Sequence, residues 1–127
     1  MEYYSDQKNV KDSVLKISFV EFPANDLAAT AVFYEKVFGW HFKADSPDYT
    51  SFNDDGLEGG FYKSTKHSAV ENGAALIVLY SKNIEAARNR VVDAGGTIIK
   101  EIYRFADGRR FRFADPRGNE LAVWSDK

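Results

Sequence analysis

The sequence contains no cysteine, which excludes disulfides, thiolate nucleophiles and cysteine-ligated metal sites. It also lacks an excess of positive charge: the formal net charge is −2, unlike that of a nucleic-acid-binding protein or of one held at an anionic membrane. No apolar run is long enough to span a bilayer, and the polar first residues contain no run of signal-peptide length. These absences predict a soluble, cytoplasmic protein that binds neither nucleic acid nor a membrane.

Two catalytic patterns are missing as well. The pairs Gly59-Gly60 and Gly95-Gly96 do not have the spacing of a phosphate-binding loop. The two histidines, His41 and His67, have no nucleophile motif near them, so no Ser-His-acid arrangement is indicated. We interpret both histidines as surface residues.

The residues that are present favour one packed domain. Apolar residues make up 44% of the 127 and aromatic residues 15%, which is enough for a hydrophobic core and argues against disorder. Residues 1–13 are polar and aperiodic, and we interpret them as a mobile arm or as a segment that pairs only in an oligomer.

Hydrophobic periodicity predicts the order of the elements in the remaining chain. Helices are expected where apolar residues recur at helical spacing, and strands where β-branched and aromatic residues alternate between turn residues. Asp26 and Asn83 are expected as N-caps, and Gly39 as the residue after the first helix. The predicted helices are 27–38 and 84–94, and the predicted strands are 14–22, 40–44, 49–53, 58–63, 74–80, 97–105, 109–114 and 120–124.

This order is βαβββ twice, separated by a polar linker over 64–73. A shift of 57 residues places Asp26 on Asn83 and Gly39 on Gly96, and a shift of 62 places Glu58 on Glu120. We interpret the match as an internal duplication. The prediction is one α+β domain over 14–127, with module one at 14–63 and module two at 74–125.

Three motifs carry a resemblance to a known family: Asn-Asp-Leu at 25–27 before a helix ending Phe-Tyr-Glu-Lys-Val-Phe-Gly-Trp at 33–40, Ala-Gly-Gly at 94–96, and Ala-Asp-Pro-Arg-Gly-Asn at 114–119. In this order they resemble the vicinal oxygen chelate superfamily, which includes glyoxalase I, bleomycin-resistance proteins and extradiol dioxygenases. The resemblance implies two βαβββ modules, paired in a homodimer or within one chain, that form a curved sheet around a cleft, and often a divalent metal with two ligands from each module.

The resemblance also places the four ligand positions, on the first and last strands of each module. They correspond to Phe19, Gly60, Leu76 and Ala122 in this chain. None of these residues offers a side-chain oxygen or nitrogen, and a divalent ion needs several such donors. We therefore expect no metal, and no other cofactor, at the position that the family uses.

Strand alternation predicts which residues share a face with these four positions. The opposite face is expected to pack beneath the helices, with Phe22, Phe52, Phe111 and Phe113 among its residues. The candidate residues on the cleft face are Glu21, as a possible catalytic base, and, as ligand contacts, Tyr49, Ser51, Tyr62, Tyr80, Arg110, Arg112 and Trp124.

Such a face, with a few polar groups on apolar walls, is typical of a small-molecule pocket. The arginines would suit an anion, the aromatic rings a planar ligand, and Glu21 on an apolar floor would have a raised pKa. Two alternatives stay open: Glu21 pairs with Arg112 and fills the cleft, or Tyr62, Tyr80 and Trp124 belong to a dimer interface or to the core.

Three functions follow from this face. The favoured one is metal-free binding of a small organic, anionic or aromatic ligand between the modules of a homodimeric protein. The second is a metal-independent lyase or isomerase with Glu21 as general base and Arg110 or Arg112 stabilising an oxyanion. The third is a non-catalytic interaction module whose cleft is filled by its own side chains.

Overall fold

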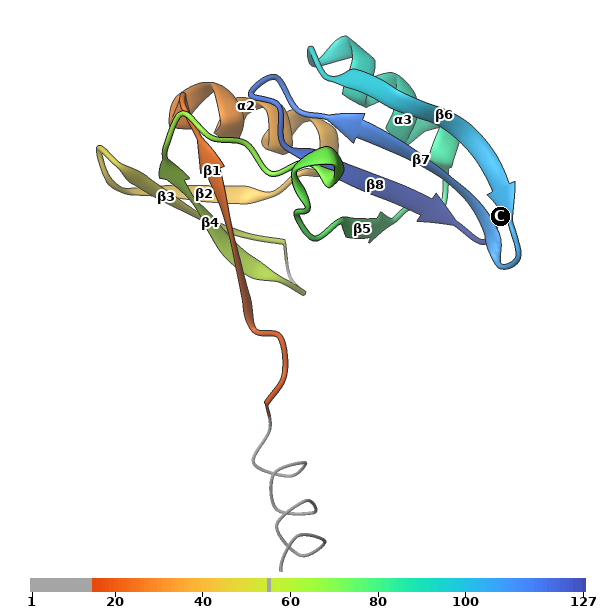
Figure 1. Ribbon diagram of the computed structural model, residues 1–127, viewed down its shortest axis with the longest axis horizontal. Helices are drawn as coiled ribbons and strands as arrows, with labels where there is room; N and C mark the ends of the chain where they lie inside the picture. Colours follow the sequence, from red (N-terminus) through yellow and green to blue (C-terminus); the bar gives the residue numbers. More distant parts are fainter. Residues whose placement is uncertain (1–14, 55) are drawn as a thin grey trace, which may run out of the picture.

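The computed structural model describes residues 15–54 and 56–127, which form two four-stranded sheets with two α-helices (Figure 1). The element order is βαβββ in each half, so the predicted α+β fold of two tandem modules is confirmed. The proposed arm at 1–13 lies outside the described residues, and its role stays a prediction.

The first sheet has the strand order β1-β4-β3-β2. Strands β1 and β4 are parallel, whereas the β2–β3 and β3–β4 pairs are antiparallel. The first and last strands of the module therefore lie side by side. Its elements are β1 (Phe19–Ala24), α2 (Leu27–Phe38), β2 (His41–Ser46), β3 (Tyr49–Asn53) and β4 (Glu58–Lys63).

The second sheet repeats this topology, with the order β5-β8-β7-β6 and a parallel β5–β8 pair. The equivalent order in both halves agrees with the duplication that the sequence overlay indicates. Its elements are β5 (Ile77–Tyr80), α3 (Ile84–Asp93), β6 (Thr97–Phe105), β7 (Gly108–Ala114) and β8 (Glu120–Ser125).

The two helices begin in the same way, as their sequences predict. The Asp26 carboxylate accepts a hydrogen bond of 3.0 Å from the Ala29 amide, and the Asn83 side chain accepts an equivalent one from Ala86. Each cap satisfies an amide that has no partner within the helix. Gly39 ends α2 with a φ of 72°, a left-handed conformation that favours glycine.

The start of the first strand differs from the prediction. β1 begins at Phe19 rather than at residue 14, and it continues through Pro23, where the sequence predicts a turn. Pro23 is tolerated because β1 is an edge strand, and an edge position leaves one side of the strand without ladder hydrogen bonds.

The linker at 64–73 contains a 3-10 turn, η1 (Val70–Asn72), that the sequence did not predict. The Ala74 amide donates to the Ala69 carbonyl at 3.2 Å, which closes this turn. The predicted strand at 74–80 is therefore shortened to β5.

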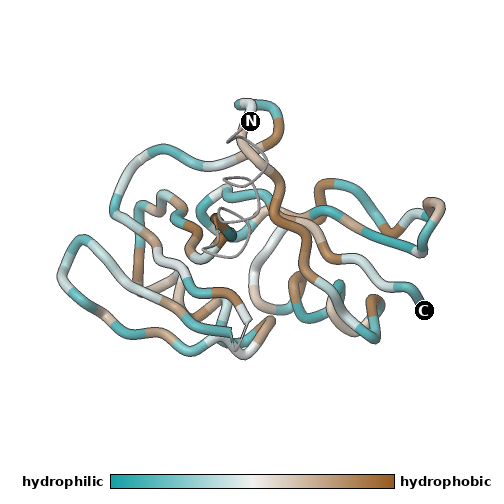
Figure 2. The backbone as a smooth tube through the Cα atoms, turned by 90° about the horizontal axis from the view of Figure 1, so that it is seen from below, coloured by the Kyte–Doolittle hydropathy of each residue, from teal (hydrophilic) through white to brown (hydrophobic). Residues whose placement is uncertain are grey.

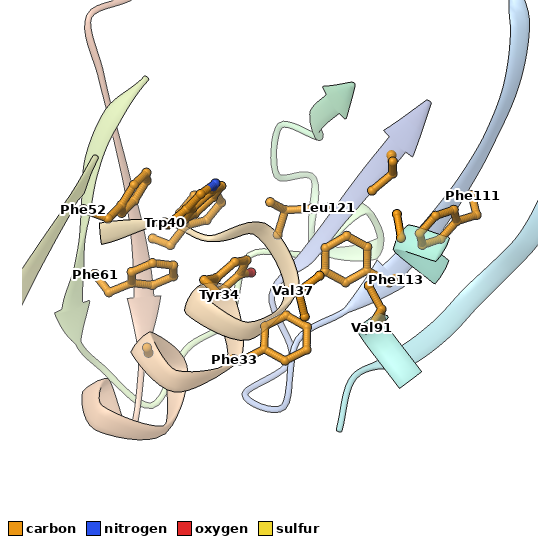
Figure 3. Packing of buried hydrophobic residues seen from close by; sticks show 14 of the residues in the cluster. Phe33, Tyr34, Val37, Trp40, Phe52, Phe61, Val91, Phe111, Phe113 and Leu121 are labelled. Atoms are coloured by element: carbon orange, nitrogen blue, oxygen red, sulfur yellow. The ribbon is translucent and has the colours of Figure 1, made fainter. Parts of the chain in front are cut away.

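Both modules contribute to one hydrophobic core. Tyr34 and Phe33 of α2 are 0% and 1% exposed, and they lie between Phe61 of the first sheet and Phe113 of the second (Figure 3). The rings of Tyr34 and Phe61 are 5.3 Å apart, and those of Phe33 and Phe113 are 6.1 Å apart. Because α2 packs against residues of both sheets, burial in the core holds the modules together.

The predicted strand faces are confirmed by this core. Phe22, Phe52, Phe111 and Phe113 are all buried in it, and the strand neighbours of Phe52, Phe111 and Phe113 are more exposed. In β7, the buried Phe111 and Phe113 flank the partly exposed Arg112, and hydrophobic and hydrophilic stretches occur in both modules (Figure 2). Each sheet therefore has one face toward the helices and one face away from them, which we call the open face.

The turn between β7 and β8 ties several elements together. The Tyr34 hydroxyl donates to Asp115 Oδ2 at 2.8 Å, and Asp115 Oδ1 accepts from the Arg117 and Asn119 amides. Asn119 Nδ2 donates to the Pro23 carbonyl at 2.6 Å, and its Oδ1 accepts from the Ser68 amide at 2.7 Å. This turn thus connects α2, β1 and the linker.

The buried Tyr34 hydroxyl makes stability sensitive to alkaline pH. Burial, and then the Asp115 carboxylate, raise the pKa of Tyr34 well above its usual value, so the folded state keeps a proton that the unfolded state releases near pH 10. Stability from this group is complete below pH 10 and is lost as the pH rises further. In urea unfolding, the free energy of unfolding of Tyr34→Phe should fall less steeply above pH 10 than that of the natural chain. The difference in slope should be up to about 1.4 kcal/mol per pH unit.

The same variant is expected to be less stable than the natural chain near pH 8, by about 1 to 2 kcal/mol, because Asp115 loses a buried donor. Parallel pH profiles of the two proteins between pH 10 and 11 would contradict this role for Tyr34.

Candidate functional site

The open face of the first sheet carries a tyrosine–carboxylate pair. The strand register places Glu21 of β1, Gly60 of β4 and Ser51 of β3 in one row. The Tyr49 hydroxyl donates to Glu21 Oε2 at 2.8 Å. Burial, and then this hydrogen bond, raise the pKa of Tyr49 to about 12. Glu21 is exposed rather than set on an apolar floor.

The Tyr49 side chain leaves no room for a side chain at Gly60. A Cβ atom built there would collide with the hydroxyl and ring of Tyr49, which lies over this position. One of the four positions that the resemblance assigns to metal ligands is therefore covered by Tyr49.

The open face of the second sheet carries an ion pair. Arg112 Nη1 of β7 lies 3.1 Å from Glu120 Oε2 of β8, and the Glu120 side chain is 8% exposed. Glu120 Oε1 accepts a hydrogen bond of 3.1 Å from the Val70 amide in the linker. The alternative in which Arg112 pairs with Glu21 is therefore wrong, because Arg112 pairs with Glu120 and the Glu21 carboxylate accepts from Tyr49.

A pocket of about 510 Å³ opens beside this ion pair, and we call it the Arg112 pocket. Its wall on one side is the linker, which backbone hydrogen bonds hold against β8: the Glu120 amide donates to the Ser68 carbonyl at 2.8 Å. The residues that line it include His67, Val70, Ile99, Arg112, Ala114 and Glu120. Apolar walls with a few charged or polar groups are a usual composition for a small-molecule site.

A second pocket, of about 450 Å³, lies over the first sheet and includes Ser51 and His41. The Arg112 pocket and this one each involve a single sheet, and only two of the predicted ligand contacts line either of them. Arg112 lines the first pocket and Ser51 the second. Neither lining includes Glu21 or Tyr49.

The remaining candidates sit toward one end of the second sheet or on the first. The Tyr80 and Trp124 rings meet edge to face at 5.2 Å, and Tyr80 donates to Asp126 Oδ1 at 2.6 Å. Arg110 Nε donates to the Tyr103 hydroxyl at 2.6 Å. Tyr62 is 42% exposed. These contacts leave the aromatic rings accessible, and they are not core residues.

Sequence reasoning missed two parts of this site. Glu120 shares the open face by alternation, but its pairing with Arg112 depends on the register of β7 and β8. His67 was placed on the surface, and it is exposed, yet it also lines the Arg112 pocket. No periodic signal marks His67, because the linker has no repeating structure.

The family's metal does not fit this chain. Of its four ligand positions, Gly60 and Ala122 are buried beneath neighbours, while Phe19 and Leu76 are hydrocarbon side chains on the edge strand and just before β5. Within residues 15–54 and 56–127, no three His, Asp or Glu side chains gather in a way that would hold a metal ion.

A sequence model of the Glyoxalase/Bleomycin resistance protein/Dioxygenase superfamily matches residues 16–123. The chain belongs to this superfamily. No curated protein matches it. No helix of the described part is long and apolar enough to cross a membrane.

Solved structures of the superfamily share this fold at low sequence identity. A family enzyme from Burkholderia phytofirmans PsJN is 20% identical with a TM-score of 0.74, covering 88% of this chain and 99% of that one. The fosfomycin resistance protein FosX from Listeria monocytogenes is 15% identical with a TM-score of 0.73, covering 88% and 93%. A lactoylglutathione lyase from Agrobacterium tumefaciens is 18% identical with a TM-score of 0.66, covering 88% and 94%.

Proposed function

We propose that this protein binds a small organic molecule on the open faces of its two modules, without a metal at the superfamily's usual position. The observation that carries the proposal is the combination of four ligand positions without donors and a pocket of about 510 Å³ on the same side of the sheets. The four positions offer a metal ion no side-chain donors, whereas the pocket offers space for a small molecule.

The chemistry of the open face supports a ligand with an aromatic or planar part. Tyr62 and Tyr80 are 42% and 48% exposed, and Trp124 packs against Tyr80. Exposed rings of this kind offer large apolar area for stacking. The pocket also argues against a face filled by its own side chains, which was the interaction-module alternative.

The chain is proposed to act as a homodimer in the cytoplasm. Exposed apolar residues gather on the two open faces, where Phe19 is 47% exposed and Val78 is 40% exposed. Apolar surface of this kind is typical of a face that meets a partner. Sedimentation equilibrium tests the dimer, and a monomer at all concentrations would contradict it.

A thermal-shift screen of small acids, aldehydes and antibiotics tests ligand binding. We expect at least one class to raise the melting temperature in a saturable way, because a ligand that binds only the folded state stabilises it. If no compound shifts the melting temperature and none perturbs open-face amide signals in NMR spectra, the proposal is wrong.

The second candidate is a metal-independent lyase or isomerase. Its supporting observation is Glu21, which takes part in no ion pair within the described residues and accepts its hydrogen bond from Tyr49. Glu21→Gln separates the two functions: an enzyme that uses this carboxylate as a base should lose at least about a hundredfold in kcat with ligand affinity kept. Unchanged turnover of an identified substrate would exclude Glu21 as the base.

A further inference from the structure

The ion pair in the Arg112 pocket restricts which ligands the pocket accepts. An isolated arginine favours an anion, because its guanidinium matches a carboxylate in charge and geometry. Arg112 is not isolated, since the Glu120 carboxylate lies 3.1 Å away and is almost fully buried. A second carboxylate placed on the same guanidinium would lie close to Glu120, in a setting where water screens the repulsion poorly.

A second carboxylate in the lining of the pocket also disfavours an anionic ligand. Glu71 also lines it, so the lining holds two carboxylates and one guanidinium, a net negative charge with histidine neutral. Glu120 cannot easily turn away to make room, because its other oxygen accepts from the Val70 amide at 3.1 Å.

Arg112 nevertheless keeps hydrogen-bond donors for a ligand. Within the described part of the chain, the ion pair with Glu120 is the only polar contact of its guanidinium, and its side chain is 26% exposed. A guanidinium carries five N–H donors, so several stay available to an acceptor. The walls beside it, Val70, Ile99 and Ala114, are apolar.

We infer that the Arg112 pocket selects neutral ligands with a carbonyl acceptor, such as amides, ketones or lactones, against carboxylates of the same shape. The carbonyl oxygen accepts from the Arg112 guanidinium, and the apolar part of the ligand packs on Val70 and Ile99. This inference rests on the proposed function. It assigns the pocket a neutral ligand in place of the anionic ligand that the arginines suggest in the sequence. Glu120 acts as the residue that excludes anions.

The test compares benzamide with benzoate, which have nearly the same shape and differ in charge. Binding to the full chain at neutral pH is followed by the NMR shifts of the Val70 and Gly118 amides, which border the pocket. We expect benzamide to bind at least about tenfold more tightly than benzoate. Equal affinities, or tighter binding of benzoate, would overturn the inference and leave the proposed function standing.

The variant Glu120→Gln removes the net negative charge of the pocket while keeping an acceptor for the Val70 amide. Benzoate should then gain at least about tenfold in affinity, and benzamide should change by less than about threefold. Glu101→Gln is the matched control: it removes a carboxylate that pairs with Arg88 at 2.7 Å outside the pocket, so neither affinity should change. A benzoate gain of the same size in both variants would overturn the role of Glu120.

Two further outcomes keep this inference separate from the proposed function. If neither compound shifts the Val70 and Gly118 signals of the natural chain, the assignment of the Arg112 pocket is wrong, and the thermal-shift screen still decides whether another part of the open face binds a ligand. If Glu120→Gln does not fold, the comparison of the two compounds on the natural chain decides the inference alone.

Discussion

Replacing Asn119 with alanine is expected to lower the free energy of unfolding by about 3 kcal/mol. Asn119 is fully buried, and its side chain bonds the Pro23 carbonyl and the Ser68 amide. Alanine leaves both backbone groups without that partner, and each unsatisfied buried group costs about 1 to 3 kcal/mol. Urea unfolding measures the loss.

Asn89→Ala provides the control for this variant. Asn89 is exposed on α3, and its side chain makes a contact of 3.4 Å with Arg88. Its replacement should change stability by less than about 0.5 kcal/mol. A loss of that small size in Asn119→Ala would show that the turn at 115–119 does not hold β1 and the linker in place.

The neighbouring glycines of β4, Gly59 and Gly60, are expected to differ in how much stability their replacement by alanine costs. Gly59 faces the helices, where a Cβ would collide with the Val20 carbonyl oxygen and the Phe52 ring. The backbone of β1 cannot move aside without breaking its pairing with β4. Gly59→Ala should therefore cost about 3 kcal/mol, at the upper end of the usual range for overpacking.

Gly60→Ala should lower the free energy of unfolding by less than Gly59→Ala does. Its main effect should be to displace the Tyr49 side chain on the open face. The atoms that its Cβ would meet belong to the Tyr49 side chain, which can rotate toward solvent. Once Tyr49 leaves Glu21, its pKa should fall from about 12 toward 10, as followed by NMR of 13C-labelled tyrosine with Tyr49→Phe for assignment. An unchanged Tyr49 pKa in this variant, or equal losses of stability at both glycines, would contradict the described packing.

The faces of the strands could be predicted because they depend only on local alternation. Phe111 and Phe113 are buried, and Arg110 and Arg112 lie on the other face, as a period of two requires. The helix caps at Asp26 and Asn83 are equally local, since each bonds an amide three residues on.

The partners across the open face could not be predicted in the same way. Whether Arg112 meets Glu120 depends on the register of β7 and β8, and whether it meets Glu21 depends on how the two modules are placed. Strand alternation states neither. Gly60 illustrates the same limit: the sequence marks it as a position without a metal donor, and the structure adds that Tyr49 covers it.

The central claim is that this superfamily member keeps the fold and has lost the metal. Calorimetric titration of the untagged, EDTA-dialysed protein with Zn²⁺, Ni²⁺ and Mn²⁺ tests it most directly, together with the melting temperature at each end point. We predict no stoichiometric binding and no rise in melting temperature, because Phe19, Gly60, Leu76 and Ala122 supply no donor. One equivalent of metal bound with a raised melting temperature would contradict the claim.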